Sequence, residues 1–361
     1  MPVYSFFATG LIAYNDTIGR NMSNLQQETD NIFRFQWHIT EKCNLRCSHC
    51  YQDNYLSSGE LGSEGLKKIA DEIISALSKW GKRGDILITG GEPLLKDEAF
   101  AIINYLASFS EIARISVLTN GTLINEKIIE MIKTSNKIKD LQVSLDGANP
   151  GTHDSIRGNH AFQKAINGIR LLRKNKIDVE VMFTLQRGNA GDVPSLIDLV
   201  NAEGIKSLTI ERFVPQGRGK KIGRGSLSSR ELKKIFRYVS NRACQGIEEG
   251  SATHISRSRP LWVLTGSNVG GVCSIGLDGM CILPDSTVLP CRRLPIPLGN
   301  LKEDRLLTIW HRSKLLWEIA DRRNLKGKCH SCEFVNRCSG CRAMAFAYTG
   351  DYLAEDPQCF K

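Results

Sequence analysis

The stretch TEKCNLRCSHCYQD, residues 40–53, decides how the rest of the chain is interpreted. It places Cys43, Cys47 and Cys50 in one loop, with gaps of three and two residues between them. The loop directly follows FRFQWHIT (33–40), a run typical of a buried strand. Four cysteines would close a structural zinc site, whereas three leave a metal with an open coordination position. The odd number therefore indicates either a degraded zinc knuckle or a metal centre that keeps one position for another ligand.

Outward from this loop, strand-like runs alternate with helical patterns. The strand-like runs are FRFQWHIT (33–40), DILIT (85–89), RISVLT (114–119), LQVSLD (141–146), VEVMFTL (179–185) and SLTIERF (207–213). Helices are predicted at 63–80, at 126–133 with Asn125 or a neighbour as the cap, at 162–174 and at 193–204. This alternation predicts an α/β fold with a parallel sheet and right-handed crossovers. Six units are too few to close an eight-fold barrel, so we expect an open, partial (β/α)6 TIM-like barrel.

The periodicity ends near residue 242, and the composition then changes. Cysteine, proline and charged residues dominate from residue 271 onward, apart from one predicted helix at 306–323. A segment with so small an apolar core needs internal staples, which the cysteines can supply. We therefore expect four parts: an N-terminal extension (1–33), the partial barrel (34–242), a linker (243–270) and a small cysteine-rich C-terminal iron–sulfur domain (271–361).

Composition narrows the classes of function. No uninterrupted apolar run is long enough to span a membrane, and the N-terminus lacks the pattern of a signal peptide, so the cytoplasm is the expected location. Twelve cysteines in such a chain indicate metal or redox chemistry rather than disulfides. The formal net charge of +10 does not by itself indicate nucleic acid, because clusters bound by thiolates would lower it. The basic run GRGKKIGRG (217–225) contains no aromatic residue and is expected to be a solvated or substrate-facing loop.

Polar motifs follow the next three predicted strands as well. TGGEPLL brings Gly90, Gly91, Glu92 and Pro93 after the second strand. LTNGTL brings Asn120 after the third, and SLDG brings Ser144 and Asp146 to the end of the fourth. Taken singly, GGEP and SLDG are ordinary turns. Because the carboxyl ends of parallel barrel strands meet at one opening, their joint placement predicts a site for a polar cofactor.

The C-x3-C-x2-C-aromatic loop followed by GGEP resembles the radical S-adenosylmethionine (SAM) enzymes, over most of residues 34–240. In that family three cysteines hold three irons of a 4Fe–4S cluster, and the fourth iron binds the amino and carboxylate groups of SAM. The resemblance implies that Cys43, Cys47 and Cys50 are both metal ligands and catalytic. It also implies one-electron cleavage of SAM to a 5′-deoxyadenosyl radical, which abstracts hydrogen from a substrate.

The same resemblance implies which residues contact SAM. Glu92 and the Gly90–Gly91 backbone would hold the methionyl ammonium, Tyr51 would lie by the adenine, and Ser144 and Asp146 would contact the ribose or carboxylate. Arg157, in HDSIRG, would pair with the SAM carboxylate. The complete implied set is Tyr51, Gly90, Gly91, Glu92, Pro93, Asn120, Ser144, Asp146 and Arg157.

The C-terminal cysteines resemble a SPASM domain, the extension of this family that carries two auxiliary 4Fe–4S clusters, giving three clusters in all. The resemblance pairs Cys273, Cys281, Cys291 and Cys341 on one cluster and Cys329, Cys332, Cys338 and Cys359 on the other. Two zinc sites are the alternative, because the pairs 329/332 and 338/341 have zinc-knuckle spacing. The chain departs from the family in having only two residues between Cys338 and Cys341. Arg292 also stands where sulfatase maturases carry an aspartate base, which argues against that activity.

The resemblance implies modification of a ribosomally made peptide, most simply by crosslinking, with the auxiliary clusters serving electron transfer. The 33 residues before the barrel are too few for a leader-binding domain, so a separate protein would present the peptide. Flavodoxin or ferredoxin would be the electron donor, and neither nucleic acid nor a membrane is an expected partner. Two alternatives stay open: a tetrapyrrole or other small-molecule substrate, and a non-catalytic iron–sulfur electron carrier. His38, His49, His153 and His160 near the mouth are expected to be structural.

Overall fold

The computed structural model describes residues 31–56, 58–223, 225–266 and 270–361. Nearly all of the predicted N-terminal extension lies outside these residues. The described strands form one sheet in the order β10-β9-β8-β1-β2-β3-β4-β5-β6-β7. They are β1 (Ile32–His38), β2 (Arg83–Thr89), β3 (Ile112–Thr119), β4 (Ile138–Ser144), β5 (Asp178–Leu185), β6 (Ser207–Arg212), β7 (His254–Ser256), β8 (Gly279–Ile282), β9 (Thr287–Leu289) and β10 (Gly299–Asn300).

The six predicted strands are confirmed as β1 to β6, all parallel and in chain order. The sheet is curved but not closed, because its edge strands β10 and β7 do not pair with each other. Apolar positions such as Phe35, Ile86 and Val143 alternate along these strands with more polar ones and pack into the core. The partial-barrel prediction is therefore confirmed.

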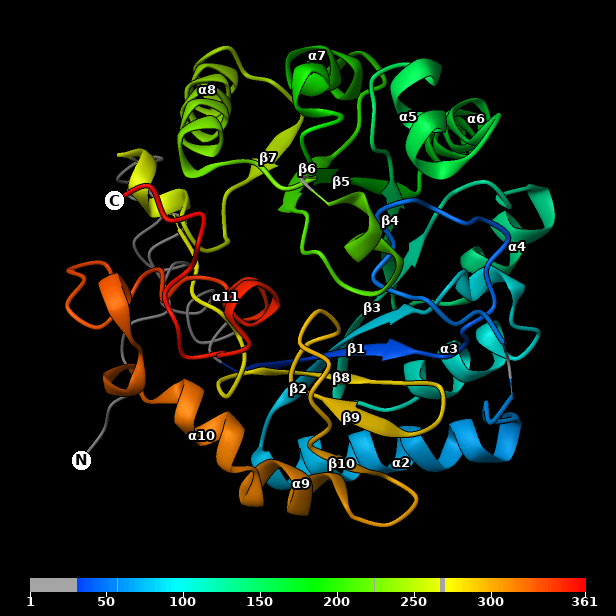
Figure 1. Ribbon diagram of the computed structural model, residues 1–361. Helices are drawn as coiled ribbons and strands as arrows, with labels where there is room; N and C mark the ends of the chain where they lie inside the picture. The colour runs from blue at the N-terminus through cyan, green and yellow to red at the C-terminus, as the bar shows by residue number, and fades with distance from the viewer. Residues whose placement is uncertain (1–30, 57, 224, 267–269) are drawn as a thin grey trace, which may run out of the picture.

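The helices lie around the outside of the sheet, as Figure 1 shows for α2 to α8. They are α2 (Ser63–Trp80), α3 (Ala99–Ala107), α4 (Glu126–Thr134), α5 (Pro150–Arg157), α6 (Ala161–Lys174), α7 (Val193–Ala202), α8 (Ser229–Glu248), α9 (Leu306–Arg312), α10 (Lys314–Ala320) and α11 (Arg342–Thr349). The predicted span 63–80 is confirmed as α2, which buries Leu66, Ile73 and Leu77 on one face. Asn125 caps α4 as predicted, because its side chain accepts a hydrogen bond from the backbone N–H of Ile128.

Two expectations about the second half of the chain were incomplete. Strands β7 to β10 escaped the sequence analysis because they are two to four residues long, too short to show alternation. The single helix expected at 306–323 is two helices, α9 and α10. Ser313 between them has extended backbone and accepts a hydrogen bond from the N–H of Leu316, so it ends one helix and caps the next.

The cysteine-rich segment continues the barrel sheet. Strand β8 pairs in parallel with β1, with Phe35 opposite Met280 and Gln36 opposite Cys281. The segment expected as a linker contributes Trp262, which is fully buried and stacks on Phe236 of α8 at a ring separation of 3.7 Å. One hydrophobic core therefore runs through both halves. The domain boundaries stay a prediction.

None of the helices in the described part of the chain combines the length and the apolar character needed to cross a bilayer. The cytoplasmic location expected from the sequence stays a prediction.

A buried ion pair fastens the C-terminal segment to the barrel. Arg212, at the end of β6, donates from Nη2 to Asp356 Oδ2 at 2.7 Å and from Nη1 to Asp356 Oδ1 at 3.0 Å. Asp356 also accepts from the N–H of Cys341, and Gln358 donates to the carbonyl of Leu227. Burial alone would raise the pKa of Asp356, but Arg212 holds it below its ordinary value.

Replacing Asp356 by alanine should lower the free energy of unfolding by about 3–5 kcal/mol, because it leaves the Arg212 guanidinium buried and unpaired. Chemical denaturation of the two proteins in the same metal-loading state measures the loss. The exposed pair Lys206–Asp178 is the control, since Asp178→Ala should cost less than about 1 kcal/mol. Equal losses from the two substitutions would contradict the assigned role of Asp356.

Candidate metal and cofactor site

The three cysteines lie in a loop without regular secondary structure, between β1 and α2 at the carboxyl end of the strands. Cys47 is buried, and Cys43 and Cys50 are half-buried. Backbone groups from distant segments hold the loop: the N–H of Ser48 donates to the carbonyl of Ile156 at 2.8 Å, and that of Gly219 to the carbonyl of Cys50 at 2.9 Å.

The GGEP turn after β2 packs directly on the first part of this loop. The N–H of Gly91 donates to the carbonyl of Thr40, and that of Glu92 to the carbonyl of Lys42. A Cβ at Gly90 would lie 2.3 Å from the Thr40 oxygen, and one at Gly91 would lie 2.3 Å from the Lys42 oxygen. Both positions therefore require glycine, because only glycine lets the two backbones approach this closely.

The basic run at 217–225 exposes Arg218, Lys220 and Lys221 to solvent, and it also packs against the cysteine loop. Its residues Gly217–Ile222 form the short helix η3, which lies against the second half of the cysteine loop. Gly217 has φ +50, and a Cβ there would lie 2.1 Å from the Tyr51 carbonyl oxygen. The glycines of this run, rather than its charges, give it a role at the site.

Glu92 is fully buried and is surrounded by hydrogen-bond donors. Its Oε1 accepts from the Thr119 hydroxyl at 2.8 Å, and its Oε2 accepts from the Asn120 N–H at 2.8 Å. Asn120 reaches onward, because its side-chain amide donates to Asn44 at 2.8 Å and lies 4.0 Å from the Cys43 sulfur. Burial raises the pKa of Glu92 to about 7, although these donors act in the opposite direction.

Asp146 forms a second buried charge cluster, with Arg157 and His49. Its Oδ2 accepts from Arg157 Nε at 2.6 Å and lies 3.2 Å from His49 Nε2, while its Oδ1 accepts from the N–H of Thr184 at 2.7 Å. Burial would raise the pKa of Asp146, but Arg157 and His49 hold it well below its ordinary value. Since Asp146 is already engaged by these donors, it positions Arg157, whose Nη1 lies 3.9 Å from the Cys47 sulfur.

Tyr51 connects the loop to the C-terminal half. The Arg292 guanidinium lies over its ring at 4.7 Å, and the fully buried His38 lies at 5.9 Å. Burial, and then Arg292, hold the pKa of His38 well below its ordinary value, so the imidazole is neutral. Of the other implied contacts, Ser144 is half-buried at the end of β4 and Pro93 is buried in the turn.

The donor set around the three sulfurs suits a cluster bound by thiolates. The N–H groups of Leu45 and Gln52 point at the sulfurs of Cys43 and Cys50, each at 3.4 Å. Burial raises the pKa of the Cys47 thiol to about 12, even though Arg157 acts to lower it. A bound metal would have to keep such a thiol ionised, as metals do. Cys43, Cys47 and Cys50 are therefore the residues that would hold the cluster.

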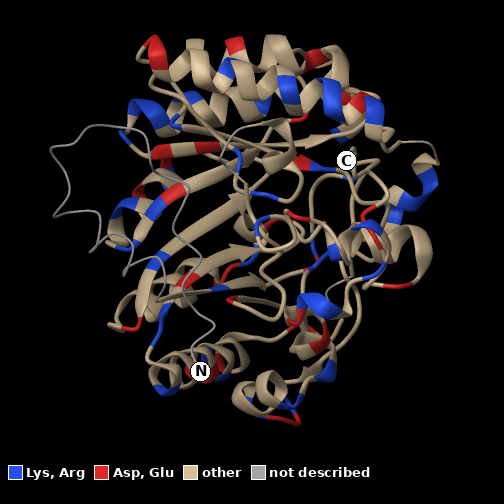
Figure 2. Cartoon of the chain, turned by 90° about the vertical axis from the view of Figure 1, so that its left-hand side faces the viewer, with Lys and Arg blue, Asp and Glu red and all other residues tan. Residues whose placement is uncertain are grey.

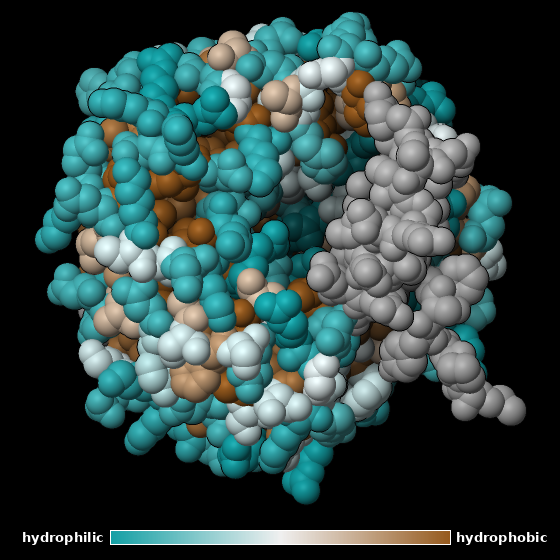
Figure 3. Space-filling model, turned by 180° about the vertical axis from the view of Figure 1, so that it is seen from behind, coloured by the Kyte–Doolittle hydropathy of each residue, from teal (hydrophilic) through white to brown (hydrophobic). Residues whose placement is uncertain are grey.

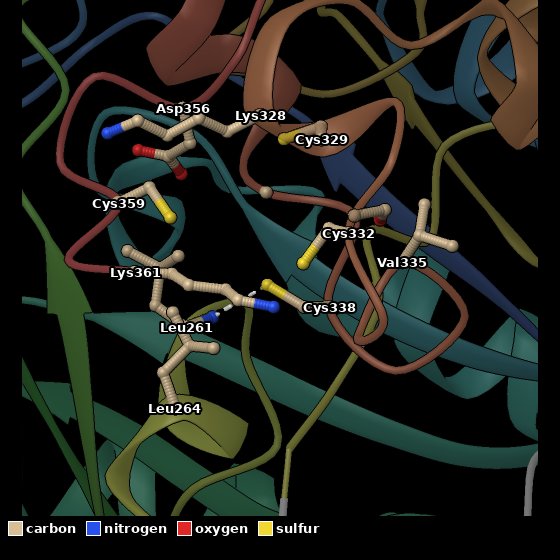
Figure 4. A pocket seen from close by; sticks show the side chains of 12 residues that line it. Leu261, Leu264, Lys328, Cys329, Cys332, Val335, Cys338, Asp356, Cys359 and Lys361 are labelled. Carbon is tan, nitrogen blue, oxygen red and sulfur yellow. Dashed lines mark hydrogen bonds between the residues drawn. The ribbon is translucent and has the colours of Figure 1, made fainter.

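The second auxiliary set is gathered around one cavity. Figure 4 shows the four cysteines around this small cavity. They are Cys329, Cys332, Cys338 and Cys359. The backbone N–H of Leu261 donates to the Cys338 sulfur at 3.2 Å, and Lys361 reaches across the cavity toward Cys338. Four thiols around one space are the arrangement that a 4Fe–4S cluster requires.

The first auxiliary set lies closer to the barrel. Burial, together with the neighbouring Cys341 and Cys291, raises the pKa of the Cys273 thiol to about 11. Cys281 is fully buried on β8, and this burial raises the pKa of its thiol. Arg292 acts to lower that pKa, and Cys291 acts to raise it further. The shortened 338–341 gap adopts left-handed backbone at both Ser339 (φ +52) and Gly340 (φ +64). This tight turn leaves Cys338 on the cavity of the second set and Cys341 beside Cys273.

Sequence reasoning missed several residues that hold the site together. Glu60 accepts from the Thr40 hydroxyl, the Glu41 N–H and Lys96, so it braces the start of the cysteine loop. The Gln52 amide lies 2.5 Å from the Glu41 carbonyl and closes the loop from inside. Neither residue belongs to a motif, and each reaches its partners only through the folded chain. The two glycines of GRG, Gly217 and Gly219, were a usable signal for the close approach of η3.

Comparison with known families shows two matches. The Radical SAM superfamily matches residues 37–200, and the iron-sulfur cluster-binding SPASM domain matches residues 273–333. The first range contains the three loop cysteines and every cofactor contact implied above. The second contains five of the eight auxiliary cysteines, at positions 273, 281, 291, 329 and 332.

Individual relatives divide between two substrate classes. The chain is 31% identical to an AdoMet-dependent heme synthase of Methanosarcina barkeri, covering 90% of this chain and 95% of that protein. It is 26% identical to the mycofactocin maturase MftC of Mycolicibacterium smegmatis, covering 95% and 86%. Among solved structures, anSMEcpe with bound AdoMet superposes with a TM-score of 0.73 at 20% identity, covering 91% and 90%, which supports the fold.

The raised pKa of Glu92 predicts how SAM binding depends on pH. If the ionised carboxylate holds the methionyl ammonium, SAM affinity should be constant above pH 8 and fall as the pH drops below about 7, where Glu92 is protonated. Equilibrium dialysis of labelled SAM against the reconstituted protein from pH 6 to 8.5 measures this. Glu92→Gln should bind SAM weakly at every pH in the range. A wild-type affinity that does not change between pH 6 and 8 would contradict the assignment.

Proposed function

The chain belongs to the radical SAM superfamily and carries a SPASM domain, and from this we propose that it oxidatively decarboxylates the propionate side chains of a porphyrin-type tetrapyrrole. SAM and three 4Fe–4S clusters, one of them SAM-binding, would be its cofactors. Of the substrates that the sequence left open, the proposal favours a tetrapyrrole over a peptide. Family membership favours an enzyme over a non-catalytic electron carrier.

The relatives supply the first support. The likeness to an AdoMet-dependent heme synthase extends over nearly the whole length of both chains, so it includes the cysteine-rich segment as well as the barrel. Substrate choice in such a protein depends on the side chains around the opening of the barrel, so these side chains provide the further support for the proposal.

The position of Arg292 is the main structural support for the proposal. It follows Cys291 in the C-terminal half, yet its guanidinium lies over Tyr51, the residue after Cys50, and so it bridges the two halves at the site. Its buried Nε has no hydrogen-bond partner in the described part of the chain. Arg293 is the contrast, because it is committed to Glu211 at 3.0 Å. A cation that stacks on an aromatic ring and keeps free donors suits the carboxylate of a flat, aromatic substrate.

The molecule has a polar hollow on its surface and polar side chains inside the barrel. Figure 3 shows a hydrophilic hollow in the middle of the face opposite to that of Figure 1. Within the barrel, alternate strand positions carry polar side chains, among them Gln142, which donates to Glu180 at 3.0 Å.

The chemistry balances for a propionate side chain. When bound, SAM and the cluster would supply the 5′-deoxyadenosyl radical that takes one hydrogen atom from the side-chain carbon next to the ring. The carboxylate then leaves as carbon dioxide, a vinyl group remains, and one electron is released. The auxiliary cysteines would hold the groups that accept this electron.

The binding of SAM and of the substrate would fall to different residues of this chain. Glu92, with the Gly90–Gly91 backbone, would hold the SAM ammonium. Arg157, positioned by Asp146, would face its carboxylate. Arg292 would hold the substrate carboxylate before it leaves, and the neutral His38 beside it adds no competing positive charge.

A ribosomally made peptide is the second candidate substrate, and the likeness to the mycofactocin maturase MftC supports it. In that case a separate leader-binding protein would present the peptide. The same loop, turn and charge clusters would serve both substrates, so the two candidates differ in what contacts Arg292.

The direct test offers both substrates to the anaerobically reconstituted protein with SAM and dithionite. Iron coproporphyrin III should stimulate release of 5′-deoxyadenosine and lose carbon dioxide and two hydrogens per converted side chain, as read by mass spectrometry. Peptides encoded beside the gene form the comparison arm. Turnover of a peptide with no change in the porphyrin would overturn the tetrapyrrole proposal in favour of the second candidate.

Arg292→Gln should weaken binding of iron coproporphyrin III by roughly 10- to 100-fold, because one hydrogen bond to a charged group is lost. Titration followed by the porphyrin absorption band measures the dissociation constant. Arg292→Lys keeps the charge but loses the planar guanidinium. Its dissociation constant for the porphyrin should lie between those of the wild type and Arg292→Gln. SAM binding should be the same in all three proteins; a variant that binds the porphyrin as well as the wild type would contradict the role of Arg292.

A further inference from the structure

A second surface feature lies beside the cavity of the second auxiliary cysteine set. It is a groove between α8, η4 (Trp262–Thr265) and the C-terminal segment. Its lining includes Lys233, Arg237, Arg337 and Lys361, with Phe334 and Phe360 between them. We call these six residues the basic groove.

The basic groove and the cysteine cavity share a wall. Leu264 and Lys361 line both of them, so a molecule seated in the groove is separated from the four cysteines by single side chains. Figure 4 shows Leu264 and Lys361 on this side of the cavity, opposite Cys329. The groove is therefore the place where an outside molecule comes close to the group that these cysteines would hold.

All the charged side chains in the described lining of the basic groove are positive. No Asp or Glu is among its described lining residues. Lys361 pairs with Glu333 at 2.5 Å on the rim, whereas Lys233 and Arg237 on α8 have no carboxylate within ion-pair distance in the described chain. Figure 2 marks Lys and Arg positions in blue along the ribbon near the C-terminus. Such a surface attracts an acidic partner and speeds its docking.

We propose that the basic groove is the docking site of a small acidic one-electron carrier protein, of the flavodoxin class. In the docked complex one electron passes from the iron–sulfur group behind Leu264 and Lys361 to the carrier, so that group is oxidised by one electron and the carrier is reduced by one; resting on the proposed function, this removes the electron that the substrate released. Phe334 and Phe360 supply the apolar contact that a charged rim alone does not give. The proposal holds for either candidate substrate.

The test compares binding and electron transfer in the anaerobically reconstituted holoprotein. Lys233→Glu/Arg237→Glu should raise the dissociation constant for flavodoxin by at least about tenfold at low salt, because two attractive charges become repulsive. Reduction of oxidised flavodoxin by the reduced holoprotein, followed by stopped-flow absorbance, should slow by a similar factor. Raising the salt concentration should weaken binding to the wild type and have little effect on the variant.

Lys68→Glu/Lys127→Glu is the matched control, since it makes the same change in net charge at exposed positions on α2 and α4. It should bind flavodoxin within about twofold of the wild type, as expected for charges beyond the screening length. SAM cleavage driven by dithionite should be equal in all three proteins, which shows that the site itself is intact. Equal flavodoxin binding by the groove variant and the wild type would overturn the proposal, as would equal losses in both variants. An RNA or anionic vesicles binding in place of flavodoxin would overturn it too.

Discussion

The close packing of three backbone segments around the cysteine loop is the constraint on which the rest depends. The loop has no regular structure, so its shape comes from the GGEP turn on one side and helix η3 on the other. Gly90, Gly91 and Gly217 each sit where a side-chain carbon would overlap a carbonyl oxygen of the loop. Since a cluster needs three thiols at fixed positions, these glycines serve the chemistry although none of them supplies a ligand.

Buried charge pairs fix the two sides of the site in a similar manner. Asp146 holds Arg157 beside the Cys47 sulfur, and Asp356 holds the C-terminal segment against Arg212 on β6. Each carboxylate is fully buried and kept ionised by its arginine, so neither partner can be removed without exposing the other charge to an apolar interior. The pairs therefore act as positional constraints on the cysteines more than as sources of stability.

The pairing of β8 with β1 explains how two sequence-distant halves make one site. It brings the C-terminal segment onto the edge of the barrel and places Arg292 over Tyr51. The same segment carries the second cysteine set outward to the basic groove. The C-terminal half thus carries Arg292 at the site on one side and the basic groove on the other, the two features on which the proposals rest.

The sequence by itself determined the barrel strands, the helix α2 and the family, because periodicity and motif spacing are local properties of the chain. The short strands β7 to β10, the break at Ser313, the bracing by Glu60 and Gln52 and the place of Arg292 were decided only by the tertiary structure. These features depend on partners that lie far away along the chain. A two-residue strand or a lone glutamate has no periodic signature, and its role exists only once the partner segment has been folded against it.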